Sequence, residues 1–336
     1  MPAGTLMIIG GAEDKLRRRT ILREFVAASG GEHARIAVLP TASSLGPAVV
    51  EVYDALFRRL GAAEVASVNP SGRDDAHNPA WVETLEKATG VFMTGGNQLK
   101  LSSVVCGTPV GDAILAAHRR GAVVAGTSAG ASIQASHMVA FGVGGATAKQ
   151  RMTQVAAGLG LVESAVIDQH FDQRNRYGRL LMIVAQSPQL LGIGVDEDTA
   201  AVVTRVDGHE HLRVVGRGAV TILDPARIVT DAYEAKRSAP LLASGVVLHA
   251  LPAGTSFDLS TRTLLPRQVV VDPEDAAELA DAQADLARIT RDIAAADASP
   301  SALRRRMSRI RRSRAAPSPA DPADADPHPQ DGAPHD

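Results

Sequence analysis

The sequence contains little that would place the protein in an oxidising compartment, in a membrane or on a nucleic acid. Its single cysteine, Cys106, excludes an internal disulfide and a cysteine-based zinc cluster. Positive and negative charges nearly cancel, with 35 Lys+Arg against 37 Asp+Glu, so no global basic excess predicts nucleic-acid binding. Residues 1–11 do not resemble a signal peptide, and no apolar run reaches the roughly 18 residues that span a bilayer. We therefore expect a cytoplasmic protein without a membrane or nucleic-acid partner.

What the sequence does contain is an alternation of strand-like and helix-like segments. Short apolar runs rich in β-branched residues predict strands at residues 5–9, 35–39, 65–68, 90–93 and 122–125. Apolar residues at helical spacing between them predict helices at 17–28, 48–60 and 112–119. This alternation predicts a three-layer α/β fold, with a mostly parallel sheet and helices on both of its faces. A further strand and helix are predicted at 165–167 and 174–185, followed by short antiparallel strands at 200–206, 211–215 and 219–223.

The composition changes near residue 272 and divides the chain into three parts. Residues 1–272 are predicted to form a single catalytic α/β domain. Asp272-Pro273-Glu274-Asp275 has the capping residue, proline and acids of a helix start, which predicts a helix over 273–297. Residues 298–336 are first arginine-rich and then rich in Pro, Ala and Asp, so we expect them to be disordered.

The segment Gly126-Thr127-Ser128-Ala129-Gly130 has the pattern of a nucleophilic serine. It follows a predicted strand and has the G-x-S-x-G spacing of the sharp strand-to-helix turn that exposes a serine hydroxyl. The crowded turn requires small neighbours, and the helix that follows directs backbone N–H groups toward developing negative charge. The alternative is a glycine-rich turn that only packs tightly.

A nucleophilic serine needs a base, and His170 is the best placed of the ten histidines. It ends the predicted strand at 165–167, and the carboxyl ends of strands form the ligand sites of α/β folds. His137 is expected on the helix after Ser128, facing away from it. Asp196 and Glu197 follow another strand-like run, and because side chains alternate along it, only one of them should reach the imidazole.

Two further glycine-rich turns follow predicted strands. Thr94-Gly95-Gly96-Asn97-Gln98 allows a close backbone approach, so we expect the N–H groups of Gly96 and Ala129 to form the oxyanion hole. Residues 10–15, Gly-Gly-Ala-Glu-Asp-Lys, resemble a phosphate loop but lack its G-K-[ST] ending, and a structural role is predicted for them. His209 and His211 share a strand face without a third ligand. We predict no metal and no cofactor.

With these motifs in order, the chain resembles the cyanophycinases over about residues 5–271. These are serine exopeptidases on a glutamine-amidotransferase-like (flavodoxin-like) α/β fold and are related to the aspartyl dipeptidases. The resemblance rests on the three glycine-rich turns, on Asp168-Gln169-His170-Phe171 and on the segment 192–200. It implies Ser128 as nucleophile, His170 as base and Glu197 as the carboxylate that orients the base. It also implies a pocket for substrate binding, formed by Gln98, Asp168, Gln169, Arg174, Arg176 and Arg179.

The resemblance further implies the reaction and the partners. The substrate would be cyanophycin, a poly-aspartate whose side chains carry arginine, cleaved to β-aspartyl-arginine dipeptides through an acyl-enzyme on Ser128. Arginine forks in the pocket would match free carboxylates, although without the resemblance a solvated helix face would be preferred for them. Asn97 stands where the family often has an acid. A homodimer is expected. The alternatives are a related serine peptidase acting on other β-aspartyl or aspartyl peptides, or a catalytically silent binding protein.

Overall fold

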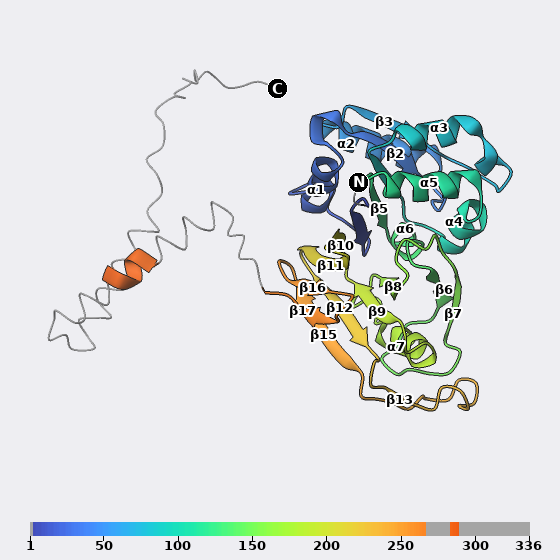
Figure 1. Cartoon of the computed structure of the whole chain (residues 1–336), viewed down its shortest axis with the longest axis vertical. Coiled ribbons are helices and arrows are strands. Elements are labelled where there is room, and N and C mark those ends of the chain that lie inside the picture. Colours follow the sequence, from blue (N-terminus) through green and yellow to red (C-terminus); the bar gives the residue numbers. More distant parts are fainter. Residues whose placement is uncertain (1–2, 267–282, 289–336) are drawn as a thin grey trace, which may run out of the picture. The chain divides into compact units, whose positions relative to one another are not determined.

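The computed structural model describes residues 3–266 and 283–288 (Figure 1). The chain separates into two units, Met1–Val269 and Val270–Asp336. In the second unit, the described residues 283–288 are helical and lie within the predicted helix at 273–297. The rest of that predicted helix, and the predicted disordered segment 298–336, lie outside the described residues.

Five parallel strands form one half of the main sheet. They lie in the order β1 (Leu6–Ile9), β5 (Val123–Thr127), β4 (Gly90–Met93), β2 (Arg35–Leu39) and β3 (Glu64–Ser67). The side chains of β1 alternate between two cores, because Leu6 and Ile8 join one cluster and Met7 and Ile9 join the other. Such strands, buried on both faces, are continuous apolar runs, which is why the sequence predicted them well.

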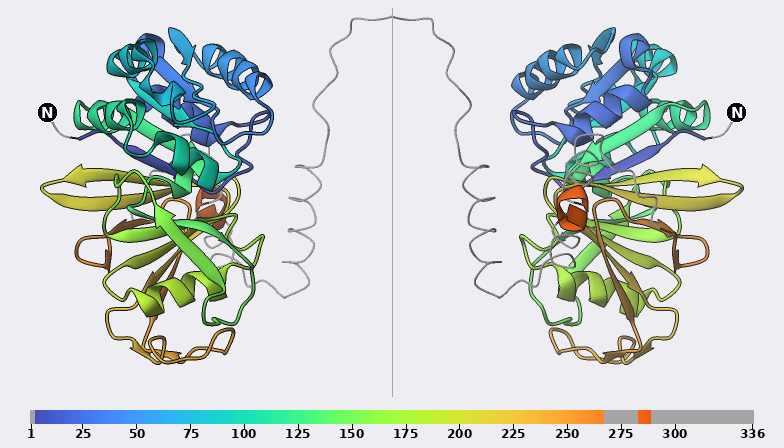
Figure 2. Two further views of the ribbon diagram at one scale, coloured as in Figure 1. Left: turned by 90° about the vertical axis from the view of Figure 1, so that its right-hand side faces the viewer. Right: turned by 90° about the vertical axis from the view of Figure 1, so that its left-hand side faces the viewer.

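Helices cover both faces of this parallel half, as predicted (Figures 1 and 2). One face packs against α1 (Thr20–Ala28) and α2 (Pro47–Arg59), where Phe25, Phe57 and Phe92 meet with ring centroids 5.1–5.4 Å apart. The other face carries helices with the bounds α3 (Pro79–Lys87), α4 (Gln98–Val105) and α5 (Pro109–Arg119). The hydrophobic pattern did not predict α3 and α4, which are only nine and eight residues long. Their starts are nevertheless marked, because Asn78 and Asn97 cap them.

The other half of the main sheet is antiparallel and larger than predicted. β10 (Thr199–Val206) pairs antiparallel with β1, and the sheet continues through β11 (His209–Gly216), β16 (Ser256–Asp258) and β17 (Thr263–Leu264). The strands predicted at 200–206 and 211–215 are β10 and β11. The α/β class is thus confirmed, and the nine-stranded sheet is mixed rather than mostly parallel.

A second, four-stranded sheet lies below the parallel half of the first in Figure 1. Its order is β15 (Val247–Pro252), β12 (Ala219–Asp224), β9 (Leu191–Val195) and β8 (Ala165–Gln169), with β8 and β9 parallel. One face packs against α7 (Tyr177–Gln186), and the other joins the core beneath the main sheet. The strand predicted at 165–167 is therefore β8, in a sheet separate from the parallel one.

A short helix and a hairpin connect the two sheets. α6 (Ala129–Ser132) follows β5, and β6 (His137–Gly142) then pairs with β7 (Thr153–Ala157). His137 therefore begins a strand, and its predicted place on a helix is wrong. The helix ends at Ser132, and residues 133–136 form a turn that leads into the strand, in which Met138, Val139 and Ala140 are all buried. The remaining short elements of this unit are the 3₁₀ turns η1 (Gly31–His33) and η2 (Asp75–His77) and the strands β13 (Val229–Thr230) and β14 (Ala243–Ser244).

Within the described ranges, no single helix is long and apolar enough to cross a membrane. Only α4 and α5 taken together have the required length and composition, and they are bent by 93° at their junction and contribute buried residues to the core.

Candidate active site

Ser128 lies in a strained turn between β5 and α6. Its φ of 52° and ψ of −106° fall in a region that side-chain-bearing residues rarely occupy. The turn depends on its glycines: a Cβ on Gly126 would lie 2.0 Å from the carbonyl oxygen of Gly130, and a Cβ on Gly130 would lie 2.2 Å from that of Met93. The Ser128 N–H donates to the Ile9 carbonyl at 2.9 Å, which joins the turn to β1. The sequence-predicted turn is therefore present.

Three side chains from three strand ends form one chain of hydrogen bonds. His170, just after β8, has its Nε2 2.9 Å from the Ser128 Oγ. Its Nδ1 is 2.6 Å from Oε1 of Glu197, which follows β9. The His170 backbone N–H donates to the Gly10 carbonyl at 2.8 Å, so the second sheet is tied to the first beside the serine. This is the arrangement in which a carboxylate orients an imidazole and the imidazole accepts a serine proton.

The geometry also separates the two acids that the residue pattern left open. Asp196 is turned away from the imidazole: its two carboxylate oxygens accept from the backbone N–H groups of Asp172 and Ala219, both at 3.1 Å. Glu197 alone of the two contacts His170. Asp196 therefore fixes the chain around the site.

His170 is neutral at pH 7. Burial of the ring, which is only 8% exposed, lowers the pKa of His170, the hydrogen bond with Glu197 opposes this, and the positive charges of Arg174 and Arg176 lower it further. The Nδ1 proton is assigned to the bond with Glu197, since a carboxylate only accepts. Nε2 is then left free to accept the hydroxyl proton of Ser128.

The predicted oxyanion donors lie next to the serine. A Cβ on Gly95 would be 3.3 Å from the Ser128 Cβ, which places the 94–97 turn against the nucleophile. Gly96 has φ +143°, and a Cβ there would lie 2.0 Å from the Ala42 carbonyl oxygen, so only glycine fits. In the described part of the chain, the N–H groups of Gly96 and Ala129 donate no hydrogen bond. Both donors remain available.

A cavity of about 490 Å³ adjoins this turn and contains several of the predicted pocket residues. Its wall includes Gly96, Gln98, Arg176 and Arg179, together with Ala42, Ser44, Asn97, Ala140, Phe141 and Gly142. Asn97 also caps α4, with its side chain accepting from the Lys100 N–H at 3.0 Å, a role that an aspartate would fill equally well.

Behind this wall, Asp168 holds both arginines. The Arg179 Nε and Nη2 donate to its two carboxylate oxygens at 2.6 and 2.5 Å, and the Arg176 Nη1 donates at 3.1 Å. Asp168 is fully buried and Arg179 is 2% exposed, so these arginines are not a solvated helix face. Gln169 is also buried and accepts from the Ser132 hydroxyl at 2.7 Å. Arg174 differs, since it is exposed and precedes α7.

One buried acid of the site was not predicted. Glu13, in the glycine-rich loop after β1, accepts from the Thr127 hydroxyl at 2.6 Å, from the Tyr53 hydroxyl at 2.5 Å and from Lys15 at 2.7 Å. A second cavity, of about 400 Å³, lies between this loop, Ser128 and α2. The available signal was topological: β1 and β5 are parallel neighbours, so the loop after β1 must meet the turn after β5.

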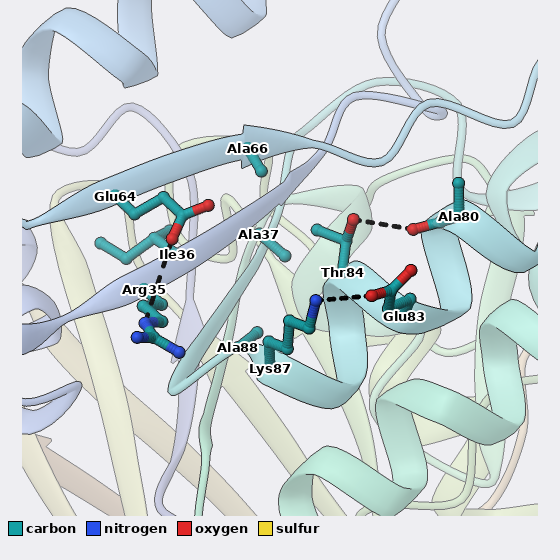
Figure 3. Close-up of a pocket in the computed structure, with 10 residues that line it drawn as sticks. All are labelled: Arg35, Ile36, Ala37, Glu64, Ala66, Ala80, Glu83, Thr84, Lys87 and Ala88. Carbon is teal, nitrogen blue, oxygen red and sulfur yellow. Dashed lines mark hydrogen bonds and ion pairs between the residues drawn. The ribbon is translucent and has the colours of Figure 1, made fainter.

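Other polar clusters lie away from Ser128. The pocket drawn in Figure 3, between α3 and the edge strand β3, is lined by charges that pair with each other, Arg35 with Glu64 and Lys87 with Glu83. His209 and His211 both face Asp258, at 3.1 and 3.9 Å. Across the described residues, no group of three or more His, Cys, Asp or Glu side chains is arranged to hold a metal.

Known proteins with this sequence pattern are peptidases. Residues 6–211 match the model of peptidase family S51. The cyanophycinase of Nostoc sp. is 41% identical over 263 residues, covering 78% of this chain and 87% of that protein. The cyanophycinase of Synechococcus elongatus is 38% identical over 269 residues, covering 77% and 80%.

One solved structure has a similar fold. A peptidase from an acI-B1 Actinobacterium superimposes with a TM-score of 0.56 at 24% identity, covering 76% of this chain and 97% of that one. With the serine turn, the hydrogen-bonded histidine and glutamate, and these relatives, the chain belongs to peptidase family S51.

Proposed function

We propose that the protein is a serine-type cyanophycinase that releases β-aspartyl-arginine dipeptides from cyanophycin. The observation that carries this proposal is the continuous chain from the Ser128 Oγ through His170 to Glu197, with steps of 2.9 and 2.6 Å. It occurs in a chain that is 38–41% identical to cyanophycinases over most of its length.

In the proposed first step, the Ser128 Oγ attacks the scissile carbonyl carbon. The hydroxyl proton moves to Nε2 of His170, and the negative charge of Glu197 stabilises the imidazolium that forms. The carbonyl oxygen becomes an oxyanion that the N–H groups of Gly96 and Ala129 are placed to bind. The carbon–nitrogen bond then breaks, the imidazolium protonates the departing amine, and an ester on Ser128 remains.

The second step reverses these roles with water. His170 removes a proton from the water, the resulting hydroxide attacks the ester carbonyl, and the Ser128 Oγ leaves with the proton returned by the imidazolium. Because a neutral imidazole starts both steps, the lowered pKa of His170 suits the site to neutral pH.

For substrate binding, the cavity beside Gly96 is the proposed position of the β-aspartyl-arginine unit. Gln98, Arg176 and Arg179 line it, and exposed Arg174 can approach it from the turn before α7. A substrate carboxylate would meet the arginine donors that Asp168 does not use. Asp168 and Gln169 are proposed to act from behind, by fixing the arginines and α6, because both are buried.

The proposal also includes the organisation of the protein. We assign catalysis to residues 1–272 and no catalytic role to the helix at 273–297 or the segment 298–336. A cytoplasmic location is proposed from the amino-acid composition, with its single cysteine, and a homodimer is proposed from the resemblance alone. Cell fractionation and light scattering of the purified chain test these two points.

The experiment is digestion of insoluble cyanophycin by the purified protein, with the soluble product identified by mass spectrometry. We expect clearing of the suspension and β-aspartyl-arginine as the product, and no clearing by Ser128→Ala. Cleavage of other β-aspartyl peptides without clearing would indicate a related serine peptidase. Binding of the polymer without any cleavage would indicate a silent binding protein.

A further inference from the structure

The loop formed by residues 10–15 contacts His170 and the chain neighbours of the other two residues of the proposed triad, Ser128 and Glu197. Gly10 accepts the His170 backbone N–H at 2.8 Å. Gly11 accepts the N–H of Asp198, the residue after Glu197, at 2.8 Å, and the Asp14 N–H donates to the Asp198 side chain at 2.8 Å. The third contact is made by Glu13, to the residue before Ser128. Three strand ends from two sheets thus meet at one short loop.

The Glu13 side chain makes a hydrogen bond to the last residue of the strand that leads into Ser128. Its Oε2 accepts from the Thr127 Oγ1 at 2.6 Å, while its Oε1 accepts from Tyr53 of α2 and from Lys15. Glu13 is 3% exposed and Thr127 is 4% exposed. A buried carboxylate with three donors is held firmly, and so is each of its partners.

The charge state of Glu13 fits this role. Burial by itself would raise the pKa of Glu13, but the charge of Lys15 and the hydrogen bonds from Lys15, Thr127 and Tyr53 outweigh it, and the pKa is lowered. Burial and the neighbouring carboxylate raise the pKa of Tyr53, which therefore keeps its proton and donates. At neutral pH the group is a carboxylate that only accepts, and Thr127 must donate to it.

Fixing Thr127 matters because Ser128 has a strained conformation that its surroundings must impose. The hydrogen bond from the Ser128 N–H to Ile9 fixes one side of the turn, and the close packing of Gly126 and Gly130 fixes the other side. The hydroxyl of Thr127 anchors the residue on which the turn begins. Without that anchor the strained φ could relax and move the Oγ away from His170.

We propose that Glu13 is a positioning residue, which holds the Ser128 hydroxyl in line with His170 through its hydrogen bond to Thr127. This inference rests on the proposed function, in which Ser128 is the nucleophile. Glu13 does not touch Ser128 or His170 by a hydrogen bond, and so it acts through Thr127 rather than on the reacting atoms.

The test uses the full chain with Thr127→Val, which keeps the shape of the side chain and removes only the hydroxyl. Thr127→Ser restores the hydroxyl and should recover activity. Thr221→Val is the matched control, because Thr221 is also a buried strand threonine but has no contact with the triad. Glu13→Gln changes the same hydrogen bond from its acceptor side, so the inference stays testable if Thr127→Val does not fold.

Three readouts separate a positioning role of Glu13 from general support of the fold. In cyanophycin hydrolysis, we expect Thr127→Val and Glu13→Gln to lower kcat at least tenfold, with KM within twofold of wild type, since displacement of a reacting atom by about 1 Å can cost 10²-fold. The rate constant for labelling of Ser128 by a small fluorophosphonate, which needs no pocket, should fall by the same factor. The midpoint of the acid limb of the pH profile should stay in place, because His170 keeps its surroundings.

The inference is overturned if Thr127→Val and Thr221→Val have the same kcat, if only KM changes, or if Thr127→Ser stays as slow as Thr127→Val. The proposed function fails by a different result, namely hydrolysis by Ser128→Ala. An inactive Ser128→Ala together with a fully active Thr127→Val would retain the nucleophile and reject the role of Glu13.

Discussion

Replacing Gly11 by alanine should inactivate the enzyme through a contact that is absent from the wild-type structure. Gly11 lies against the imidazole of His170, and a Cβ built on it would be 2.3 Å from Cε1, 2.6 Å from Nε2 and 3.0 Å from Nδ1. Its φ of +107° is also a backbone conformation that alanine rarely adopts. The substitution therefore has two costs, one steric and one conformational.

The steric cost can be worked from these distances. An ordinary contact begins at 3.4 Å, so the ring must move by about 3.4 − 2.3 = 1.1 Å. The ring is held between Ser128 and Glu197 at 2.9 and 2.6 Å, and a shift of that size breaks at least one of the two hydrogen bonds. A misplacement of about 1 Å at a catalytic group costs on the order of 10²-fold in rate. The conformational cost is about 1–2 kcal/mol in the free energy of unfolding.

A second glycine of the same chain separates the two costs. Gly61 has φ +100°, close to that of Gly11, and a Cβ there would have no atom within 4 Å. Gly61→Ala should therefore lose similar stability in urea unfolding and keep its kcat. Gly11→Ala should lose about 10²-fold in kcat for cyanophycin hydrolysis. Equal kcat values for the two variants would refute the reasoning, because the imidazole would then not depend on the space that Gly11 leaves.

Three further predictions concern the same site. Glu197→Gln should lower kcat by roughly 10³–10⁴-fold, because an amide cannot stabilise the imidazolium, whereas Asp196→Asn should have a much smaller effect; steady-state kinetics decides, and the reverse ranking would move the orienting role to Asp196. Arg179→Lys should lower the free energy of unfolding by about 3 kcal/mol, because lysine cannot make the two parallel hydrogen bonds to the buried Asp168 carboxylate. It should also lower kcat/KM for the polymer by a factor that corresponds to roughly 1.5–3 kcal/mol. Unchanged stability in urea unfolding would contradict the first expectation, and an unchanged kcat/KM would contradict the second. Arg174→Gln removes a positive charge that lowers the pKa of His170, so that pKa should rise. The acid limb of kcat/KM and the NMR titration of the free enzyme would then move to higher pH, and an unchanged midpoint would show that this charge does not act on the ring.

Local patterns were sufficient for the parallel strands and for the serine turn. The strands at residues 35–39 and 90–93 were predicted with their observed bounds, because a strand buried on both faces is apolar throughout. The turn around Ser128 was predictable because its glycines are required by contacts within a few residues, such as Gly126 against Gly130. His137 was misplaced because the helix after Ser128 is only four residues long.

Contacts between distant residues were beyond these patterns. Alternation alone left Asp196 and Glu197 as equal candidates, and only the packing of β9 against β8 and β12 turns one toward His170. The arginines after His170 resembled a solvated helix face. Arg176 and Arg179 are nevertheless buried, because they bind the carboxylate of Asp168, which lies 8 and 11 residues earlier in the chain. Nothing near Glu13 indicates a partner 114 residues further along the chain.

The sequence by itself determined which residue types were available: a serine among glycines, a histidine after a strand, two acids after another, and alternating strands and helices. Tertiary structure decided which of them meet. The proposed triad joins the ends of β5, β8 and β9, from two different sheets, and the loop at residues 10–15 contacts all three strand ends. Hydrogen bonds of 2.6–2.9 Å require side chains placed to within a few tenths of an ångström. Such placement comes from close packing of the whole core, which a local pattern of residues does not specify.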